Sequence, residues 1–167
     1  MIQVLPVHYL LLLLCLLLGA CQGYDIRVNE RIVYTPDPLF TAFEVSDSAL
    51  ADCISETIAH ESVTAAARLL SLNCSHAGIA SLEGLAVFSG LEVLRLSSNS
   101  VRNLVELGGL SGLRELYLDD NAVVDPVPLY QLPNLRYLDL SKNPDLQCPA
   151  DAGLEGVTTV ILPDHCR

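Results

Sequence analysis

A repeated pattern of leucines between residues 91 and 143 restricts the possible folds of this chain more than any other feature of the sequence. The segments LEVLRLSSN, LRELYLDDN and LRYLDLSKN begin at Leu91, Leu113 and Leu135, so successive copies are 22 residues apart. Each copy reads L-x-x-L-x-L-x-x-N. Self-similarity at a short fixed period is typical of solenoids, in which each repeat packs against its neighbours. We therefore expect one domain built by stacking a single kind of unit.

The motif resembles the consensus of leucine-rich repeats, in which one short strand per turn lines a curved face. After each strand, apolar residues recur at every third position, which suits a 3-10 or irregular segment better than an α-helix. Pro126, Pro128 and Pro133 argue further against a long helix in the unit that begins at Leu113. The resemblance, to the 22-residue class of bacterial internalins and phosphatase-regulator-type repeats, covers residues 67–167. It implies an α/β solenoid with one parallel strand per repeat.

Both ends depart from the repeat, as terminal units must when one face has no neighbour. The first unit is expected to begin at Ala67, 24 residues before Leu91, with its strand at residues 70–72 and two inserted residues around 74–78. The last unit begins at Val157 and is half a repeat.

A helix is expected before the first repeat. Residues 48–59 place Leu50, Cys53, Ile54 and Ile58 at one-face helical spacing, and Ser and Asp residues just before them suit a helix start. This segment resembles the helical N-terminal cap of internalin-like proteins, which implies that it closes one end of the solenoid.

The first twenty residues have the layout of an export signal. An apolar run from Tyr9 to Leu18 precedes a small pair, Gly19-Ala20, although no Lys or Arg precedes the run. Residues 18–21, LGAC, resemble the lipobox of bacterial lipoproteins, which implies that Cys21 is acylated and becomes the mature N-terminus. Gln22 in the next position implies the outer membrane of a Gram-negative cell. An uncleaved anchor and an ordinary secretory signal with Cys21 as a bystander are the alternatives.

These features divide the chain into four parts. The expected parts are a lipoprotein-type signal peptide (1–20), a lipidated N-terminus and tether (21–43), an N-terminal cap helix (44–66), and about four and a half repeats with a C-terminal cap (67–167).

Cysteine positions predict a disulfide at each end of the solenoid. Beyond Cys15 in the signal and Cys21, four cysteines remain, which allow three pairings. Cys74 follows the first strand, whereas Cys148 and Cys166 belong to the fourth and fifth units, three to four strand spacings of about 4.8 Å away. Because a disulfide needs Cα atoms within about 7 Å, the expected pairs are Cys53–Cys74 and Cys148–Cys166. Each is expected to stabilise one cap by roughly 3 kcal/mol.

Composition and motif content argue against several classes of function. A net charge of −11, all of it after Cys21, disfavours nucleic acid as a partner. No C-x-x-C motif occurs and the histidines are scattered, so no metal site is expected. No phosphate-binding loop or nucleophile–base arrangement is recognisable. We therefore expect neither an enzyme nor a bound cofactor.

The variable strand positions are the candidates for binding a partner. In this repeat they face the concave side, where each residue neighbours the residue 22 positions later. Tyr117 and Tyr137 beside Asp119 and Asp139 suit a protein or peptide partner, because aromatic residues are enriched at interaction hot spots. The alternative is that these are ordinary strand residues packing across the ladder. The candidate binding residues are Arg95, Glu115, Tyr117, Asp119, Tyr137, Asp139 and Lys142.

The repeated asparagines Asn99, Asn121 and Asn143 are expected to be structural, with amides that satisfy backbone groups where the chain leaves each strand.

Two classes of function follow from the sequence. One is a monomeric, lipid-anchored envelope protein whose repeats bind another protein. The other is a structural or assembly component of the envelope with no dedicated ligand on the concave face.

Overall fold

A computed structural model of the chain describes residues 25–150 and 153–166. The chain divides into two compact units, Met1–Pro38 and Leu39–Arg167. The expected signal peptide and the proposed lipid site at Cys21 lie outside the described residues.

The described part of the first unit is a β-hairpin. Strands β1 (Ile26–Val28) and β2 (Arg31–Tyr34) pair antiparallel. Both turn residues, Asn29 and Glu30, have positive φ, as in the turns that most often join hairpin strands. A tether was expected over residues 21–43. The hairpin was not predicted, because its strands are short and no glycine marks the turn.

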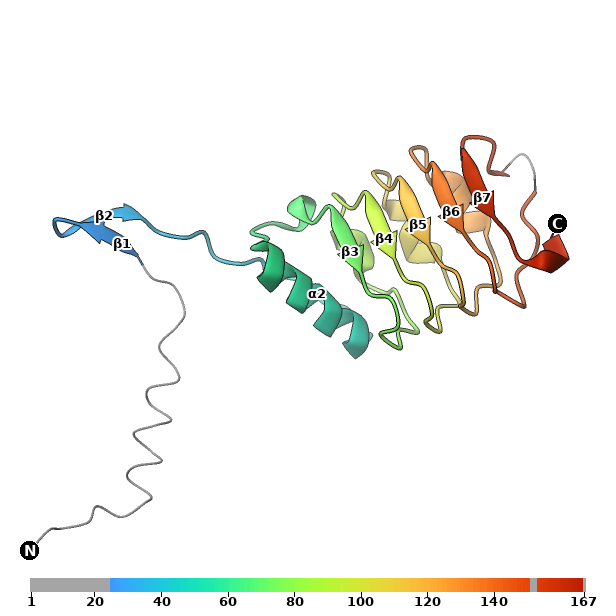
Figure 1. The fold of residues 1–167 in the computed structure, drawn as a ribbon, viewed down its shortest axis with the longest axis horizontal. Helices are drawn as coiled ribbons and strands as arrows, with labels where there is room; N and C mark the ends of the chain where they lie inside the picture. Colours follow the sequence, from blue (N-terminus) through green and yellow to red (C-terminus); the bar gives the residue numbers. More distant parts are fainter. Residues whose placement is uncertain (1–24, 151–152, 167) are drawn as a thin grey trace, which may run out of the picture. The chain divides into compact units, whose positions relative to one another are not determined.

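The second unit is a coil with one parallel strand per turn (Figure 1). In its sheet every strand pairs with the next along the chain, and paired residues are 22 positions apart throughout. The strands are β3 (Ser71–Asn73), β4 (Val93–Arg95), β5 (Glu115–Tyr117), β6 (Tyr137–Asp139) and β7 (Thr159–Ile161).

Short 3-10 helices return the chain from one strand to the next, as the spacing of apolar residues by threes predicted. Leucines from the strands and from these helices meet in one continuous core. The middle residues of β3 to β6, which include Leu94, Leu116 and Leu138, are fully buried. Between consecutive strands lie η2 (Leu85–Val87), η3 (Val105–Gly109) and η4 (Val127–Gln131), whereas η1 (Ala66–Arg68) precedes β3 and η6 (Asp164–Cys166) follows β7.

The first repeat differs from the expected one. Leu72, rather than Leu70, is the partner of Leu94, so the unit has the regular length of 22 residues and the expected two-residue insertion is absent. Successive strand residues point to opposite sides, and Leu70 is 53% exposed. By the 22-residue spacing, Cys74 takes the place of Leu96. Because Cys74 replaces the third leucine of the motif, the sequence alone did not show which residues of this repeat align with those of the next repeat.

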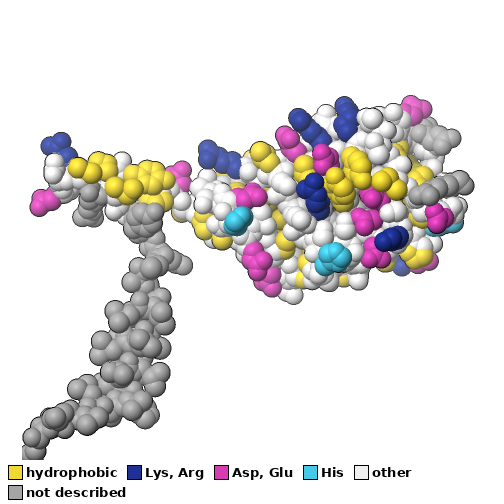
Figure 2. All heavy atoms as spheres, in the orientation of Figure 1, with side chains coloured by type: hydrophobic (Ala, Val, Ile, Leu, Met, Phe, Trp, Pro, Cys, Tyr) yellow, Lys and Arg dark blue, Asp and Glu magenta, His cyan; other side chains and the backbone are white. Residues whose placement is uncertain are grey.

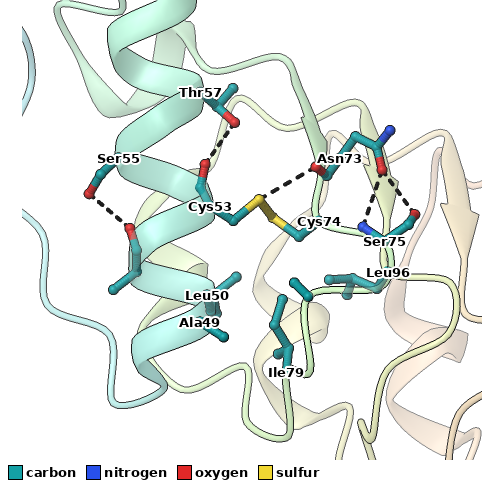
Figure 3. The surroundings of a disulfide bond; sticks show 12 residues. Ala49, Leu50, Cys53, Ser55, Thr57, Asn73, Cys74, Ser75, Ile79 and Leu96 are labelled. Carbon is teal, nitrogen blue, oxygen red and sulfur yellow. Dashed lines mark hydrogen bonds between the residues drawn. A yellow bond between two sulfur atoms is a disulfide. The ribbon is translucent and has the colours of Figure 1, made fainter.

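Helix α2 (Ser48–Glu61) covers the open end of the sheet beside β3 (Figure 1). Its apolar face buries Leu50, Ile54 and Ile58. The disulfide between Cys53 of α2 and Cys74 after β3 ties the helix to the first repeat (Figure 3). The second predicted disulfide, Cys148–Cys166, is also present at the other end. Both pairings predicted from strand spacing are therefore confirmed.

The folded unit begins earlier than the sequence suggested. The rings of Phe40 and Phe43 pack against the buried ring of Phe88, with centroids 6.0 and 5.4 Å from it. The Phe40 backbone N–H also donates to the Val63 carbonyl. Residues from Leu39 onward thus belong to the second unit, and not to a tether that continues to residue 43.

One carboxylate joins α2 to the first repeat. Asp47 is the N-cap of α2, and its Oδ1 accepts from the N–H groups of Ala49 and Leu50. Its Oδ2 accepts from the N–H groups of Ala80 and Ser81, in the loop between β3 and η2. Burial alone would raise the pKa of Asp47, but the four backbone hydrogen bonds together lower it.

The change Asp47→Ala is expected to lower the free energy of unfolding by about 2 kcal/mol, because a helix cap and a bridge between two elements are lost together. The folded-state pKa lies below the ordinary value of 3.8. The stabilisation is therefore present above pH 3.8 and is lost as the pH falls through the folded-state pKa.

Urea unfolding of both proteins at neutral pH and in acid measures this difference. Asp52→Ala, an exposed position on the same helix, is the control, and little change is expected from it. Equal effects of the two substitutions, or a difference that does not shrink in acid, would contradict the assignment.

Candidate functional site

Six of the candidate residues lie on β4, β5 and β6 or directly after them, on the side of the sheet that faces away from the core. All six are half-buried. The register aligns Arg95, Tyr117 and Asp139 in one row across the strands, and Glu115 and Tyr137 in a second row. We call this surface the tyrosine strip. It consists of Arg95, Glu115, Tyr117, Asp119, Tyr137 and Asp139.

The centre of the tyrosine strip is a stack of three side chains. The guanidinium carbon of Arg95 lies 4.8 Å from the centroid of the Tyr117 ring. The rings of Tyr117 and Tyr137 have centroids 4.7 Å apart and are tilted by 34°. Figure 2 shows hydrophobic side chains gathered in the middle of the solenoid, bordered by acidic and by Lys or Arg side chains. The stack is an ordered aromatic surface on a rigid sheet.

Glu115 secures one side of the stack. Its Oε2 accepts a hydrogen bond from the Tyr117 hydroxyl at 3.1 Å and lies 3.6 Å from Nη2 of Arg95. The charge of Glu115 is thus matched within the chain. A second ion pair joins Arg114 and Glu92 at 3.7 Å. These two residues directly precede the first residues of β5 and β4.

The three aspartates of this region are held differently. Asp119 accepts from the Ser97 hydroxyl, and Asp120 accepts from the Ser98 hydroxyl at 2.8 Å. Asp139 Oδ1 accepts from both the N–H and the hydroxyl of Ser141, at 2.9 and 2.7 Å. Within residues 25–150 and 153–166, none of the three forms an ion pair. These carboxylates are therefore oriented by neutral donors while their charges remain unmatched.

The electrostatics of the tyrosine strip act on Tyr137. Burial raises the pKa of its hydroxyl, and electrostatic interactions with Asp139, Tyr117, Asp119 and Glu115 raise it further. The phenol is therefore neutral at physiological pH and sits in a negative environment.

Lys142, the seventh candidate, lies in the turn after β6 and is exposed. It adopts the left-handed backbone conformation shared by the equivalent residues of the other repeats, His76, Ser98 and Asp120. The structure does not bring Lys142 into the stack. Ser97, Ser98 and Ser141 are among the variable positions expected on the concave side, but their hydrogen bonds to the aspartates were not predicted. The 22-residue spacing of Ser97 and Ser98 from Asp119 and Asp120 could have indicated two of these bonds.

The repeated asparagines lie behind this surface and bind backbone groups. Asn143 is fully buried; its Oδ1 accepts from the Val123 N–H, and its Nδ2 donates to the carbonyls of Leu118 and Leu140. Asn121 makes the same pattern of bonds one repeat earlier. Asn99 accepts from three N–H groups of residues 77–79. These amides link successive turns of the coil.

One group of potential metal ligands occurs in the described part of the chain. It consists of Cys148, His165 and Cys166, whose sulfur and ring nitrogen atoms lie within 4.8 Å of one another. The two sulfur atoms are bonded to each other, whereas a metal needs thiolates. His165 Nε2 lies 2.9 Å from the Leu146 carbonyl oxygen. The group is therefore a disulfide with a neighbouring histidine.

Across the residues that the structure describes, no helix combines the length and the apolar character needed to span a membrane. No protein-family model matches the chain, and no curated protein matches it either.

Solved structures do resemble it. Internalin F of Listeria monocytogenes matches with a TM-score of 0.58 and 23% identity, covering 70% of this chain and 43% of that one. Internalin C2 of the same organism matches at 33% identity and a TM-score of 0.45, covering 50% of this chain and 37% of that one. This chain therefore spans less than half the length of either internalin. The likeness to internalin F concerns the fold, and the 22-residue register is seen in the sheet of this chain. The chain folds as a short leucine-rich-repeat solenoid with a helical N-terminal cap and a disulfide at each end.

Proposed function

We propose that this chain is a protein-interaction module that binds a protein or peptide through the tyrosine strip. The observation that carries the proposal is the stack of Arg95, Tyr117 and Tyr137 on the outward face of the sheet. Tyrosine and arginine are enriched at interaction hot spots, and rings that are already stacked lose little conformational freedom on binding.

The rest of the surface supports recognition rather than catalysis. The polar groups beside the rings are carboxylates held by serine donors, an arrangement that orients the carboxylates towards a partner. A solenoid also offers an extended surface of fixed spacing, which suits a macromolecular partner. We propose no enzymatic activity and no cofactor.

The proposal includes a place in the cell. The lipobox-like residues 18–21 support acylation of Cys21 and attachment to the envelope of a bacterium, with Gln22 favouring the outer membrane of a Gram-negative cell. The two disulfides fit an oxidising compartment such as the periplasm. We expect a monomer.

Capture of partners from envelope extracts tests the binding role. The double change Tyr117→Ala with Tyr137→Ala is expected to reduce capture at least tenfold, because both rings of the stack are lost. The matched control is Val105→Ala with Val127→Ala, which changes two exposed side chains on the 3-10 helices η3 and η4.

Capture that is unchanged by the tyrosine substitutions, in a protein whose circular dichroism matches the wild type, would remove the support for this role. It would favour the alternative, an assembly component of the envelope whose concave face tolerates change.

The intact mass of the full chain expressed in a Gram-negative host tests the anchor. We expect a product that begins at Cys21, carries acyl chains and has no thiol that reacts with an alkylating agent under non-reducing conditions. A product that begins elsewhere or lacks lipid would overturn the lipoprotein proposal and leave the binding proposal to be judged by the capture experiment.

A further inference from the structure

The stack in the tyrosine strip ends at β6. Arg95 comes from β4, Tyr117 from β5 and Tyr137 from β6, so the stack runs along the solenoid from one strand to the next. The residues of β7 that continue the two rows are Thr159 and Ile161. Among the described residues, Tyr117 is the one ring that stacks on Tyr137, and no cation lies over the Tyr137 ring.

The other end of the stack shows how this surface holds a cation. There, the Arg95 guanidinium lies over the Tyr117 ring and also pairs with Glu115. The ring face and the carboxylate act together on one side chain, which is a favourable arrangement for a guanidinium because it is planar and weakly hydrated.

An aromatic ring and a carboxylate also occur together at the β6 end of the stack, which we call its open end. No cation of the described residues lies there. Asp139 is two residues after Tyr137 on β6, so both side chains leave the same face of the strand. The Asp139 carboxylate is fixed by two hydrogen bonds from Ser141 and forms no ion pair with any described residue. Asp119 and Asp120, on the neighbouring turn, are equally unmatched, and they add to the negative potential there.

We propose that the open end of the tyrosine strip binds an arginine side chain of the partner, whose guanidinium stacks on Tyr137 and pairs with Asp139. This inference rests on the proposed function and names the chemistry of its partner. The arginine extends the internal stack by one more side chain, towards β7, where the partners of Tyr137 and Asp139 are Thr159 and Ile161 and not a further ring or cation. The chain's net charge of −11 favours the approach of such a basic segment.

NMR titration of the full chain tests the inference, with the tyrosine rings isotopically labelled. The probe is acetyl-Gly-Arg-Gly-amide, and its matched control is the same peptide with citrulline, which keeps the shape of arginine and removes its charge. We expect saturable shifts of the Tyr137 ring signals with the arginine peptide, weakened by salt, and at least tenfold weaker binding of the citrulline peptide.

The decisive variant is Asp139→Asn, which keeps the side-chain oxygen that accepts from the Ser141 N–H and removes the charge. Its matched control is Asp125→Asn, because Asp125 accepts from the N–H two residues later in the same way but lies exposed at the start of η4. We expect about tenfold weaker binding of the arginine peptide to Asp139→Asn and unchanged binding to Asp125→Asn.

Equal shifts with the arginine and citrulline peptides, or equal effects of the two aspartate substitutions, would overturn the inference. The proposed function can survive that result. If partner capture is lost in the double tyrosine variant but is insensitive to Asp139→Asn, the tyrosine strip binds a partner by contacts other than arginine. If capture survives the tyrosine substitutions, the proposed function itself fails.

Discussion

Replacing Asn143 by alanine is expected to lower the free energy of unfolding by about 4 kcal/mol, a large effect for one side chain without charge. The Asn143 side chain is fully buried and makes hydrogen bonds in two turns of the coil. Alanine would leave the Val123 N–H and the Leu140 carbonyl without this partner, whereas the Leu118 carbonyl would still accept from Asn121 Nδ2. Each buried group left unsatisfied costs about 1–3 kcal/mol.

Urea unfolding monitored by circular dichroism measures the effect, with Asn134→Ala as the matched control. Asn134 is exposed and donates one hydrogen bond to the Ser111 carbonyl, so its replacement is expected to cost less than about 1 kcal/mol. A small, equal loss in both variants would mean that water replaces the buried amide, and that Asn143 does not hold adjacent turns together.

The repeated part of the fold could be predicted from the sequence because a solenoid converts sequence period directly into spatial neighbourhood. Residues 22 apart in the chain are partners in the sheet, as Leu94 and Leu116 show. The repeat spacing also placed Cys74 too far from Cys148 and Cys166 for a disulfide, so only one set of pairings was compatible with it. Both results depend on periodicity alone, and they needed no knowledge of side-chain conformation.

The terminal parts were harder because they lack that period. The sequence placed Ala67 in register with Leu91, whereas the pairing of Leu72 with Leu94 and the burial of Leu69 show that Leu69 takes that position. The hairpin at residues 26–34 has neither glycine nor a buried face to mark it. The carboxylate of Asp47 was predicted as a possible helix cap, but its second pair of hydrogen bonds spans more than thirty positions, which local pattern does not reveal.

The candidate site was predictable as a set of residues, though not as an arrangement. Register places Arg95, Tyr117 and Asp139 in one row, and the sequence predicted this row. The stack depends on side-chain torsions, which determine that Arg95 lies over the Tyr117 ring and pairs with Glu115. The difference between matched Glu115 and unmatched Asp139 likewise follows from geometry, and it is this difference that indicates which end of the strip is open to a partner.

The change Gly84→Ala is expected to cost about 4 kcal/mol, because it combines backbone strain with a collision that the fold cannot easily relieve. Gly84 has φ +91°, and a Cβ there would lie 2.1 Å from the carbonyl oxygen of Glu44. The neighbouring Glu83 carbonyl accepts from the Ser46 N–H, so the segment that leads into α2 lies directly against this loop.

Gly78→Ala separates strain from collision, because Gly78 has a similar φ of +82° but no atom within 4 Å of the added Cβ. Strain alone is expected to cost about 1–2 kcal/mol, so the excess at Gly84 measures how rigidly the N-terminal cap is held on the first repeat. Urea unfolding of the two variants gives both values. Equal losses would mean that the segment before α2 moves aside at little cost, whereas a large excess means that Asp47, the disulfide from Cys53 and the close approach at Gly84 hold the cap as one rigid element.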